Sequence, residues 1–277
     1  MKSGQIRQRC NLILIIILFY FMFFPIGLGA GQGSGKAITL TDSVQTAKTA
    51  KRMIEDLDFG TLLICPYKKY KKYKKILEET VDHSACNYEL YFEVDIYDLE
   101  NVSFRLVPFY DDVSPEVTKK QIRKARTRAE KIAKQIRKSY DTKPERIRAA
   151  HDYLCRYVRY DEGSEDGGYN PVQTAYGALI NGRAVCQGYS NAFQMLMEAL
   201  GIPASVVLGD AHAWNAVWVD GHISYIDVTW DDCNSAYGSV DDTYFMRSKK
   251  FFQKSHDWGD GYSKVVYKRY RSLWVGR

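Results

Sequence analysis

The dipeptide Asp220-Gly221 stands between two stretches that are rich in β-branched and aromatic residues. These stretches are Ala211–Val219 (AHAWNAVWV) and His222–Thr229 (HISYIDVT). Asp-Gly between such stretches is the strongest short-range signal for a β-hairpin with a two-residue turn. We therefore expect two antiparallel strands in which Val219 faces His222, and each further pair lies one residue outward on both strands.

This register brings a histidine and an aspartate together. His212 would face Thr229 and Trp214 would face Asp227, with all four side chains on one face of the hairpin. His212 and Asp227 then become diagonal neighbours, about 7–8 Å apart at the backbone and within reach of each other's side chains. An inward carboxylate on an apolar strand needs a partner, and an aspartate beside a histidine can fix the tautomer of a catalytic imidazole. A satisfied core histidine is the simpler interpretation of His212 alone, but the pair favours a functional site.

The segment 184–193, AVCQGYSNAF, places Cys186 at the expected start of a helix. Apolar residues recur at helical spacing along it, at Phe193, Leu196, Met197 and Leu200. Because Cys186 lies seven residues before Phe193, its thiol faces the buried side at the helix N-terminus. The helix dipole and the free backbone N–H groups there favour a thiolate and can hold an oxyanion. An inert buried cysteine is the alternative interpretation.

Residues 1–30 form the pattern of a secretory signal. A basic start precedes an apolar run from Leu12 to Phe24, and a stretch of small residues follows it. The run is also long enough for an uncleaved membrane anchor, so both alternatives stay open. In either case we expect the rest of the chain outside the cytoplasm.

Five cysteines follow this segment: Cys65, Cys86, Cys155, Cys186 and Cys233. An exported protein can oxidise its thiols, and an odd number leaves at least one of them free. Two disulfides, Cys65–Cys86 and Cys155–Cys233, with a free Cys186 would fit, and so would five reduced cysteines. The cysteine spacings match no structural zinc site, and we expect neither a metal nor another cofactor.

The remaining elements predict a mixed α+β chain. Helices are expected over 42–56, after Pro66, over 114–140 and over 144–157, and strands over 87–107 (two) and 204–208. In the helix after Pro66 the apolar face is expected at Tyr67, Tyr70, Ile76 and Leu77. The helix over 114–140 is expected to bury Val117, Ile122, Ala125, Ala129, Ile132, Ala133, Ile136 and Tyr140.

Two basic segments raise the question of an anionic partner. Lys119–Lys138 contains ten Lys or Arg against one Glu, and Lys68–Lys75 is also rich in lysine. Either segment could face an anionic cell-wall polymer or a membrane surface, although solvated helix faces are the simpler interpretation. Removing residues 1–30 takes away three positive charges and lowers the formal net charge from +6 to +3. This modest charge and the export pattern argue against a nucleic-acid partner.

Three ordered motifs resemble the transglutaminase-like superfamily, above all its bacterial transglutaminase/protease-like, cytokinesis-related branch. They are Ala184–Tyr189 (AVCQGY), Ala211–Asn215 (AHAWN) and Tyr225–Asp232 (YIDVTWDD). The resemblance covers about residues 144–258. It implies a papain-like α+β fold in which a nucleophile helix packs on an antiparallel sheet, within a domain over 114–277. Residues 31–113 show no clear match, and their role stays open.

The resemblance also implies the chemistry. Cys186 would be the nucleophile, His212 the general base and acid, and Asp227 the residue that orients His212. Substrate contacts are expected at Trp214, Tyr189, Gln187 and Tyr176. The expected reaction is thiol-dependent acyl transfer on a protein or peptide, with water or an amine as acceptor. A non-catalytic module of the same fold that docks on anionic cell-wall or membrane components is the alternative.

Overall fold

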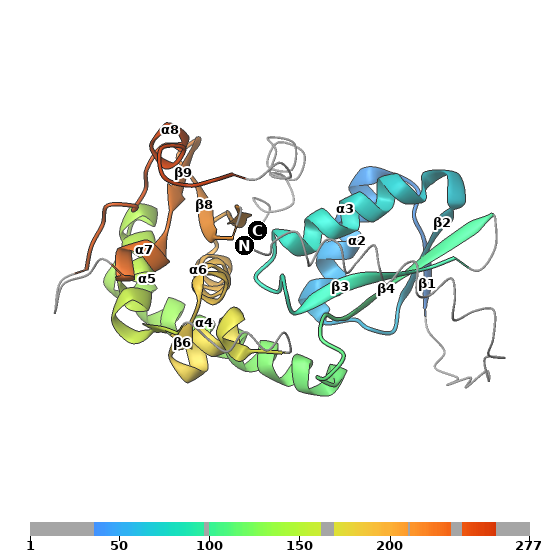
Figure 1. Ribbon diagram of the computed structural model, residues 1–277, viewed down its shortest axis with the longest axis horizontal. Coiled ribbons are helices and arrows are strands. Elements are labelled where there is room, and N and C mark those ends of the chain that lie inside the picture. The colour runs from blue at the N-terminus through green and yellow to red at the C-terminus, as the bar shows by residue number, and fades with distance from the viewer. Residues whose placement is uncertain (1–35, 97–99, 162–168, 210, 234–239, 259–277) are drawn as a thin grey trace. The chain divides into compact units, whose positions relative to one another are not determined.

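The structure is a computed structural model of residues 1–277 and describes residues 36–96, 100–161, 169–209, 211–233 and 240–258 (Figure 1). The described residues all belong to one compact unit. The predicted signal or anchor lies outside the described residues. No helix among the described residues has the length and apolar character needed to span a bilayer.

The first part of this unit is a four-stranded sheet with two helices. The sheet has the order β1-β2-β4-β3, in which β1 and β2 are parallel and the other pairs are antiparallel. The strands are β1 (Ala37–Thr39), β2 (Leu62–Pro66), β3 (Leu90–Asp95) and β4 (Asn101–Pro108), and the helices are α2 (Ser43–Asp56) and α3 (Tyr70–Asp82). The helix predicted over 42–56 and the two strands predicted over 87–107 are confirmed.

Local chemistry explains where these helices begin. The Asp42 carboxylate accepts hydrogen bonds from the backbone N–H groups of Val44 and Gln45 and so caps α2. In α3 the expected apolar face was partly wrong. Tyr73 is buried and Tyr67 is 41% exposed, because the α-helix begins only at Tyr70 and Tyr67 lies in the preceding 3-10 turn.

The long helix α4 (Pro115–Ser139) joins this part to the rest of the unit. Its N-cap is Ser114, whose hydroxyl accepts from the N–H of Val117, and Pro115 occupies the first turn. The predicted apolar stripe is buried at Ile122, Ala125, Ala129, Ile132, Ala133 and Ile136. Its two predicted end members, Val117 and Tyr140, are exposed at 44% and 42%.

The second part combines helices with a three-stranded antiparallel sheet of order β7-β8-β9. Its helices are α5 (Lys143–Tyr157), α6 (Cys186–Leu200), α7 (Val228–Cys233) and α8 (Lys249–Phe252). Its strands are β5 (Arg159–Tyr160), β6 (Arg183–Ala184), β7 (Ala204–Leu208), β8 (Ala213–Val219) and β9 (His222–Ile226). Helix α6 packs on this sheet and its buried side chains join the main core (Figure 1). The α+β class is therefore confirmed.

The β8–β9 hairpin has the predicted register, from Val219 opposite His222 to Asn215 opposite Ile226. Asp220 (φ 49°) and Gly221 (φ 84°) both lie in the left-handed region that this two-residue turn requires. The predicted extension of the second strand to Thr229 is wrong. Helix α7 begins at Val228 instead, because the Asp227 carboxylate accepts from the backbone N–H groups of its first turn.

Both candidate disulfides are wrong. Cys65, Cys86, Cys155 and Cys186 are all free thiols. Cys65 and Cys86 are buried in the core of the first part, where they pack as small apolar side chains.

Candidate active site

Cys186 is the first residue of α6 and is half-buried. The N-cap position is Val185, and no side chain caps the helix. The first backbone N–H groups of an α-helix have no partner within the helix. At the start of α6 such donors lie beside the Cys186 sulfur, where they can stabilise a developing oxyanion.

His212 connects this thiol to a carboxylate. Its Nε2 lies 2.7 Å from Oδ2 of Asp227, and its ring also forms a hydrogen bond with the side chain of Cys186. Because Nε2 is engaged by Asp227, Nδ1 is the ring atom left for the thiol. Burial lowers the pKa of His212, but the hydrogen bonds to Asp227 and Cys186 outweigh burial and raise this pKa to about 10. His212 is therefore protonated at neutral pH.

Asp227 is fully buried, and hydrogen bonds reach both of its oxygens. Oδ1 accepts from the backbone N–H groups of Thr229 (3.0 Å) and Trp230 (3.1 Å). Oδ2 accepts from His212 and from Nε2 of His256, at 3.0 Å. Burial raises the pKa of Asp227, but the bonds from the two histidines outweigh burial and lower it. The site therefore contains an ionised aspartate as a fixed anchor.

His256 also belongs to the site, although neither the predicted hairpin nor the three sequence motifs include it. It is buried, follows α8, and its Nδ1 lies 3.0 Å from the Ser255 hydroxyl. Together His212, Asp227 and His256 are a possible set of metal ligands, since their ligand atoms lie within 4.8 Å of one another. In this structure Nε2 of His212 and Nε2 of His256, two of these ligand atoms, both hydrogen-bond to Oδ2 of Asp227. Hydrogen bonding accounts for the cluster.

Aromatic rings enclose the imidazole of His212. It stacks between Trp214 (ring centroids 5.9 Å apart) and Trp230 (5.1 Å), both at 26° to it. His256 packs on the same two tryptophans, at 4.8 and 4.2 Å. A protonated imidazole is stabilised over an aromatic face, and the rings limit access of water to the His212–Asp227 pair.

Three of the four expected substrate contacts lie in the interior. Trp214 is 1% exposed and Tyr189 is fully buried, with its hydroxyl donating to Asp232. Gln187 is buried and its amide donates to Asn87 and, at 3.1 Å, to Asn191. Tyr176 is half-buried against the core. The structure therefore brings the three catalytic candidates together, but it places Trp214, Tyr189 and Gln187 where they support the site.

A second cysteine–histidine–aspartate cluster lies close by. His151, on α5, is fully buried, with Nε2 3.0 Å from Oδ2 of Asp231 and Nδ1 2.9 Å from Oδ1 of Asp152. Cys155 Sγ lies 3.8 Å from Nε2 of His151. Burial lowers the pKa of His151, but the two carboxylates outweigh burial and raise it to about 11. An imidazolium held by carboxylates on both nitrogens has no free nitrogen for proton transfer, so this cluster joins α5 to α7.

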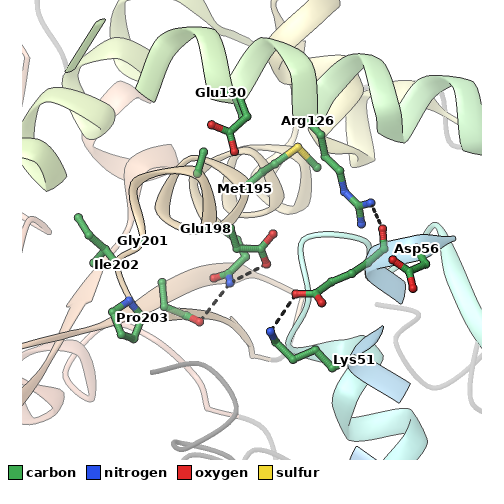
Figure 2. A pocket seen from close by; sticks show the side chains of 14 residues that line it. Lys51, Asp56, Arg126, Glu130, Met195, Glu198, Gly201, Ile202 and Pro203 are labelled. Atoms are coloured by element: carbon green, nitrogen blue, oxygen red, sulfur yellow. Dashed lines mark hydrogen bonds and ion pairs between the residues drawn. The ribbon is translucent and has the colours of Figure 1, made fainter. Parts of the chain in front are cut away.

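A cavity of about 360 Å³ lies near the other end of α6 (Figure 2). Glu130 and Glu198 face it, and Arg126 donates to the backbone carbonyls of Ile54 and Glu55 at the end of α2. Cys186 and Glu198 stand at opposite ends of α6, about 18 Å apart along the helix axis. The cavity is therefore separate from the thiol, and Arg126 holds α2 against this part of the fold.

The comparisons with known proteins agree with the sequence motifs. The sequence profile of the transglutaminase-like superfamily matches residues 130–229. Human kyphoscoliosis peptidase is 21% identical over 154 residues, which cover 48% of this chain and 23% of that protein. The mouse protein of the same name is 23% identical over 134 residues, covering 40% of this chain and 20% of its own length. This chain thus spans about a fifth of the length of these curated relatives.

Solved structures resemble the chain more loosely. A crystal structure of a TGase covers 80% of this chain and 64% of its own, with 16% identity and a TM-score of 0.38. A putative cysteine protease from Cytophaga hutchinsonii covers 50% of this chain and 62% of its own, with 16% identity and a TM-score of 0.33. Cys186, His212 and Asp227 all lie within the matched residues. Residues 130–229 of this chain belong to the transglutaminase-like superfamily.

Proposed function

We propose that this protein is an enzyme that transfers acyl groups from protein or peptide substrates through Cys186, His212 and Asp227. One observation carries the proposal. The Cys186 thiol is hydrogen-bonded to a histidine whose other ring nitrogen lies 2.7 Å from a fully buried, ionised aspartate. The nucleophile is thus within hydrogen-bond distance of a base, and the base is within hydrogen-bond distance of a group that orients it.

In the first half of the reaction the Cys186 sulfur attacks the carbonyl carbon of a carboxamide or peptide bond. The thiol proton resides on Nδ1 of His212. The carbonyl oxygen becomes an oxyanion that the backbone N–H groups at the start of α6 stabilise. His212 then gives the proton to the leaving amine, the carbon–nitrogen bond breaks, and a thioester on Cys186 remains.

In the second half the acceptor attacks the thioester. His212 removes a proton from water or from an amine, the carbon–sulfur bond breaks, and the Cys186 thiolate beside protonated His212 is restored. Water makes the protein a peptidase or amidase, and an amine makes it a crosslinking transferase. We place either activity outside the cytoplasm on the strength of the export pattern in residues 1–30.

The test is selective alkylation of the folded protein near neutral pH, read by intact mass and peptide mapping. Iodoacetamide should label Cys186 before any other cysteine, and His212→Ala should slow that labelling. Cys186→Ser is the matched control and should abolish the fast phase. Equal labelling rates with and without His212 would contradict the triad.

A second candidate function is docking on an anionic cell-wall polymer or membrane surface. A shallow groove of about 670 Å³ lies along α4, and its cationic lining residues are Lys119, Lys120, Arg123, Lys124, Arg128 and Lys131. The lysines of Lys68–Lys75 are a weaker candidate, because Lys74 and Lys75 form ion pairs with glutamates of the same helix. Co-sedimentation with anionic phospholipid vesicles or with a soluble polyanion tests this proposal. Exchanging Lys120, Arg123 and Lys124 for Glu should abolish binding, whereas unchanged binding by this variant would reject the groove.

A further inference from the structure

The first part of the fold reaches the start of the nucleophile helix. Asn87 is buried, and its side-chain oxygen accepts from the Gln187 amide. Its backbone carbonyl accepts from Nδ2 of Asn191 at 3.2 Å, and its own Nδ2 donates to the backbone carbonyl of Asp82 at 2.9 Å. Residues 87 and 187 are therefore tied together, so their sequence neighbours Tyr88 and Cys186 are held close to each other.

Tyr88 has a backbone conformation that its residue type rarely adopts. Its φ is 60°, in the left-handed region where a bulky side chain is an outlier. Hydrogen bonds on either side hold the turn, from the N–H of Glu89 and of Leu90 to the carbonyl of Cys86, both at 3.1 Å. Glycine would fit this conformation without strain. Strain of this kind gathers at ligand-binding positions, where the side chain itself is needed.

Tyr88 belongs to an exposed aromatic cluster. Tyr88, Tyr91 and Phe109 are 39%, 36% and 42% exposed. The Phe109 ring lies 5.9 Å from that of Tyr88 and 6.1 Å from that of Tyr91. Tyr110 packs edge-on against Phe109 at 5.0 Å and donates its hydroxyl to Oε1 of Gln173 at 2.6 Å. The exposed rings thus form an apolar surface. Tyr110, which is hydrogen-bonded to Gln173, holds Phe109 of this surface in place.

Tyr88 brings this aromatic cluster near the thiol, because its neighbour Asn87 is hydrogen-bonded to Gln187, the residue after Cys186. Burial, the Asp82 carboxylate and the charge of the Cys186 sulfur together raise the pKa of Tyr88. Among the described residues, 36–96 and 100–113 fall outside the profile match at 130–229. The surface therefore lies outside the residues that the family profile matches.

We propose that Tyr88, with Tyr91 and Phe109, binds an apolar side chain that flanks the attacked carbonyl of the acyl donor. This inference rests on the proposed function, because it assigns the cluster a place in the substrate site of Cys186. When an apolar side chain covers a group of exposed aromatic rings, apolar surface leaves water and the free energy of the complex falls. The region between 36 and 113 thereby determines which peptides acylate Cys186.

Two peptidyl chloromethyl ketones test the proposal, identical except that the residue before the reactive ketone is Phe or Gly. The rate of Cys186 alkylation is measured by intact mass for each. The Phe compound should react about tenfold faster with the native protein, from burial of its ring. Tyr88→Gly should remove this preference while keeping or improving thermal stability, because glycine relieves the strain at φ 60°. Tyr88→Phe should keep the preference.

Iodoacetamide separates this proposal from the proposed function, since it carries no side chain to bind. Its rate at Cys186 should be the same for the native protein and for Tyr88→Gly. Tyr140→Ala is the matched control, as Tyr140 is a similarly exposed tyrosine at the end of α4. Equal rates for the two ketones with intact iodoacetamide labelling would overturn the subsite alone. Loss of iodoacetamide labelling at Cys186 in the native protein would overturn both.

Discussion

Nε2 of His256 lies 3.0 Å from Oδ2 of Asp227, the same oxygen that accepts from Nε2 of His212 at 2.7 Å. One buried carboxylate oxygen is thus shared by two histidines. His256 is itself fixed by the Ser255 hydroxyl and by the ring of Trp214. The aspartate is therefore held in position by a residue that does not reach the thiol, and His256 acts on the site through Asp227.

Replacing His256 by Ala should slow alkylation of Cys186 without abolishing it. The change removes one charge-assisted hydrogen bond, a loss of about 1.5–3 kcal/mol, or roughly ten- to a hundredfold if all of it appears in the rate. The measurement is the iodoacetamide rate by intact mass. His222→Ala is the control, because His222 is exposed at the hairpin turn and should have no effect. An unchanged rate in His256→Ala would show that Asp227 is positioned without it.

His212 should make stability depend on pH in the alkaline range. Its pKa is raised to about 10 in the folded protein, from about 6.5 in an unfolded chain. The folded state therefore binds the proton more tightly, so the stabilisation is complete below pH 6.5 and is lost as pH rises toward 10. The urea midpoints of the native protein and of His212→Gln should converge over this range. A difference that stays constant from pH 6.5 to 10 would contradict the raised pKa.

Features of the site that depend on residues close together in the sequence could be predicted, and those that depend on distant residues could not. The hairpin register followed from Asp220-Gly221, because a two-residue turn sets the pairing on both sides of it. The end of the second strand did not, because the side chain of Asp227 caps α7 and competes with strand pairing. The predicted β-pairs of Trp214 with Asp227 and of His212 with Thr229 therefore do not form.

Contacts between distant segments had no sequence signal. His256 follows Asp227 by 29 positions and reaches it only through the packing of α8 on the sheet. Asn87 and Gln187 form a hydrogen bond although they lie 100 positions apart in the sequence. The residues around Tyr88 do not indicate that this tyrosine has a positive φ. Local turn and capping chemistry thus located the triad, while tertiary packing determined what surrounds it.

His83 should weaken the fold in acid. It is buried at the end of α3, and its Nδ1 lies 3.2 Å from the carbonyl of Val206 and 2.8 Å from the hydroxyl of Ser205. Burial lowers the pKa of His83 to about 4, so the unfolded chain takes up a proton first. The contribution of neutral His83 to the free energy of unfolding is complete above pH 6.5 and is lost as pH falls toward 4. The total loss is about 3 kcal/mol. Chemical denaturation at pH 7 and pH 4 should show this loss, and His83→Gln should reduce it.

His151→Ala should destabilise the protein strongly. The change leaves Asp231, which is fully buried, without its cationic partner, at a cost of about 3–5 kcal/mol. Adding Asp231→Asn to this variant should recover part of the loss, because no buried charge then remains. Asp152→Asn should cost less, since the Asp152 side chain keeps 24% of its exposure. Urea denaturation of these proteins and of Asp231→Asn alone measures the differences, and losses that simply add in the double variant would reject the buried pair.

The cysteines should differ in how fast they react with iodoacetamide. Burial raises the pKa of Cys86 to about 12, and it also raises the pKa of Cys65 and of Cys155 above the usual value. Thiolates are the reactive form, so these three should react slowly in the folded protein while Cys186 reacts quickly. After denaturation without reductant, all four should take up iodoacetamide, because none is bridged in the structure. Tandem mass spectrometry of the native and denatured digests identifies each site. Cys155→Ser should leave the fast phase unchanged, and a fast phase that disappears in this variant would move the nucleophile to the second cluster.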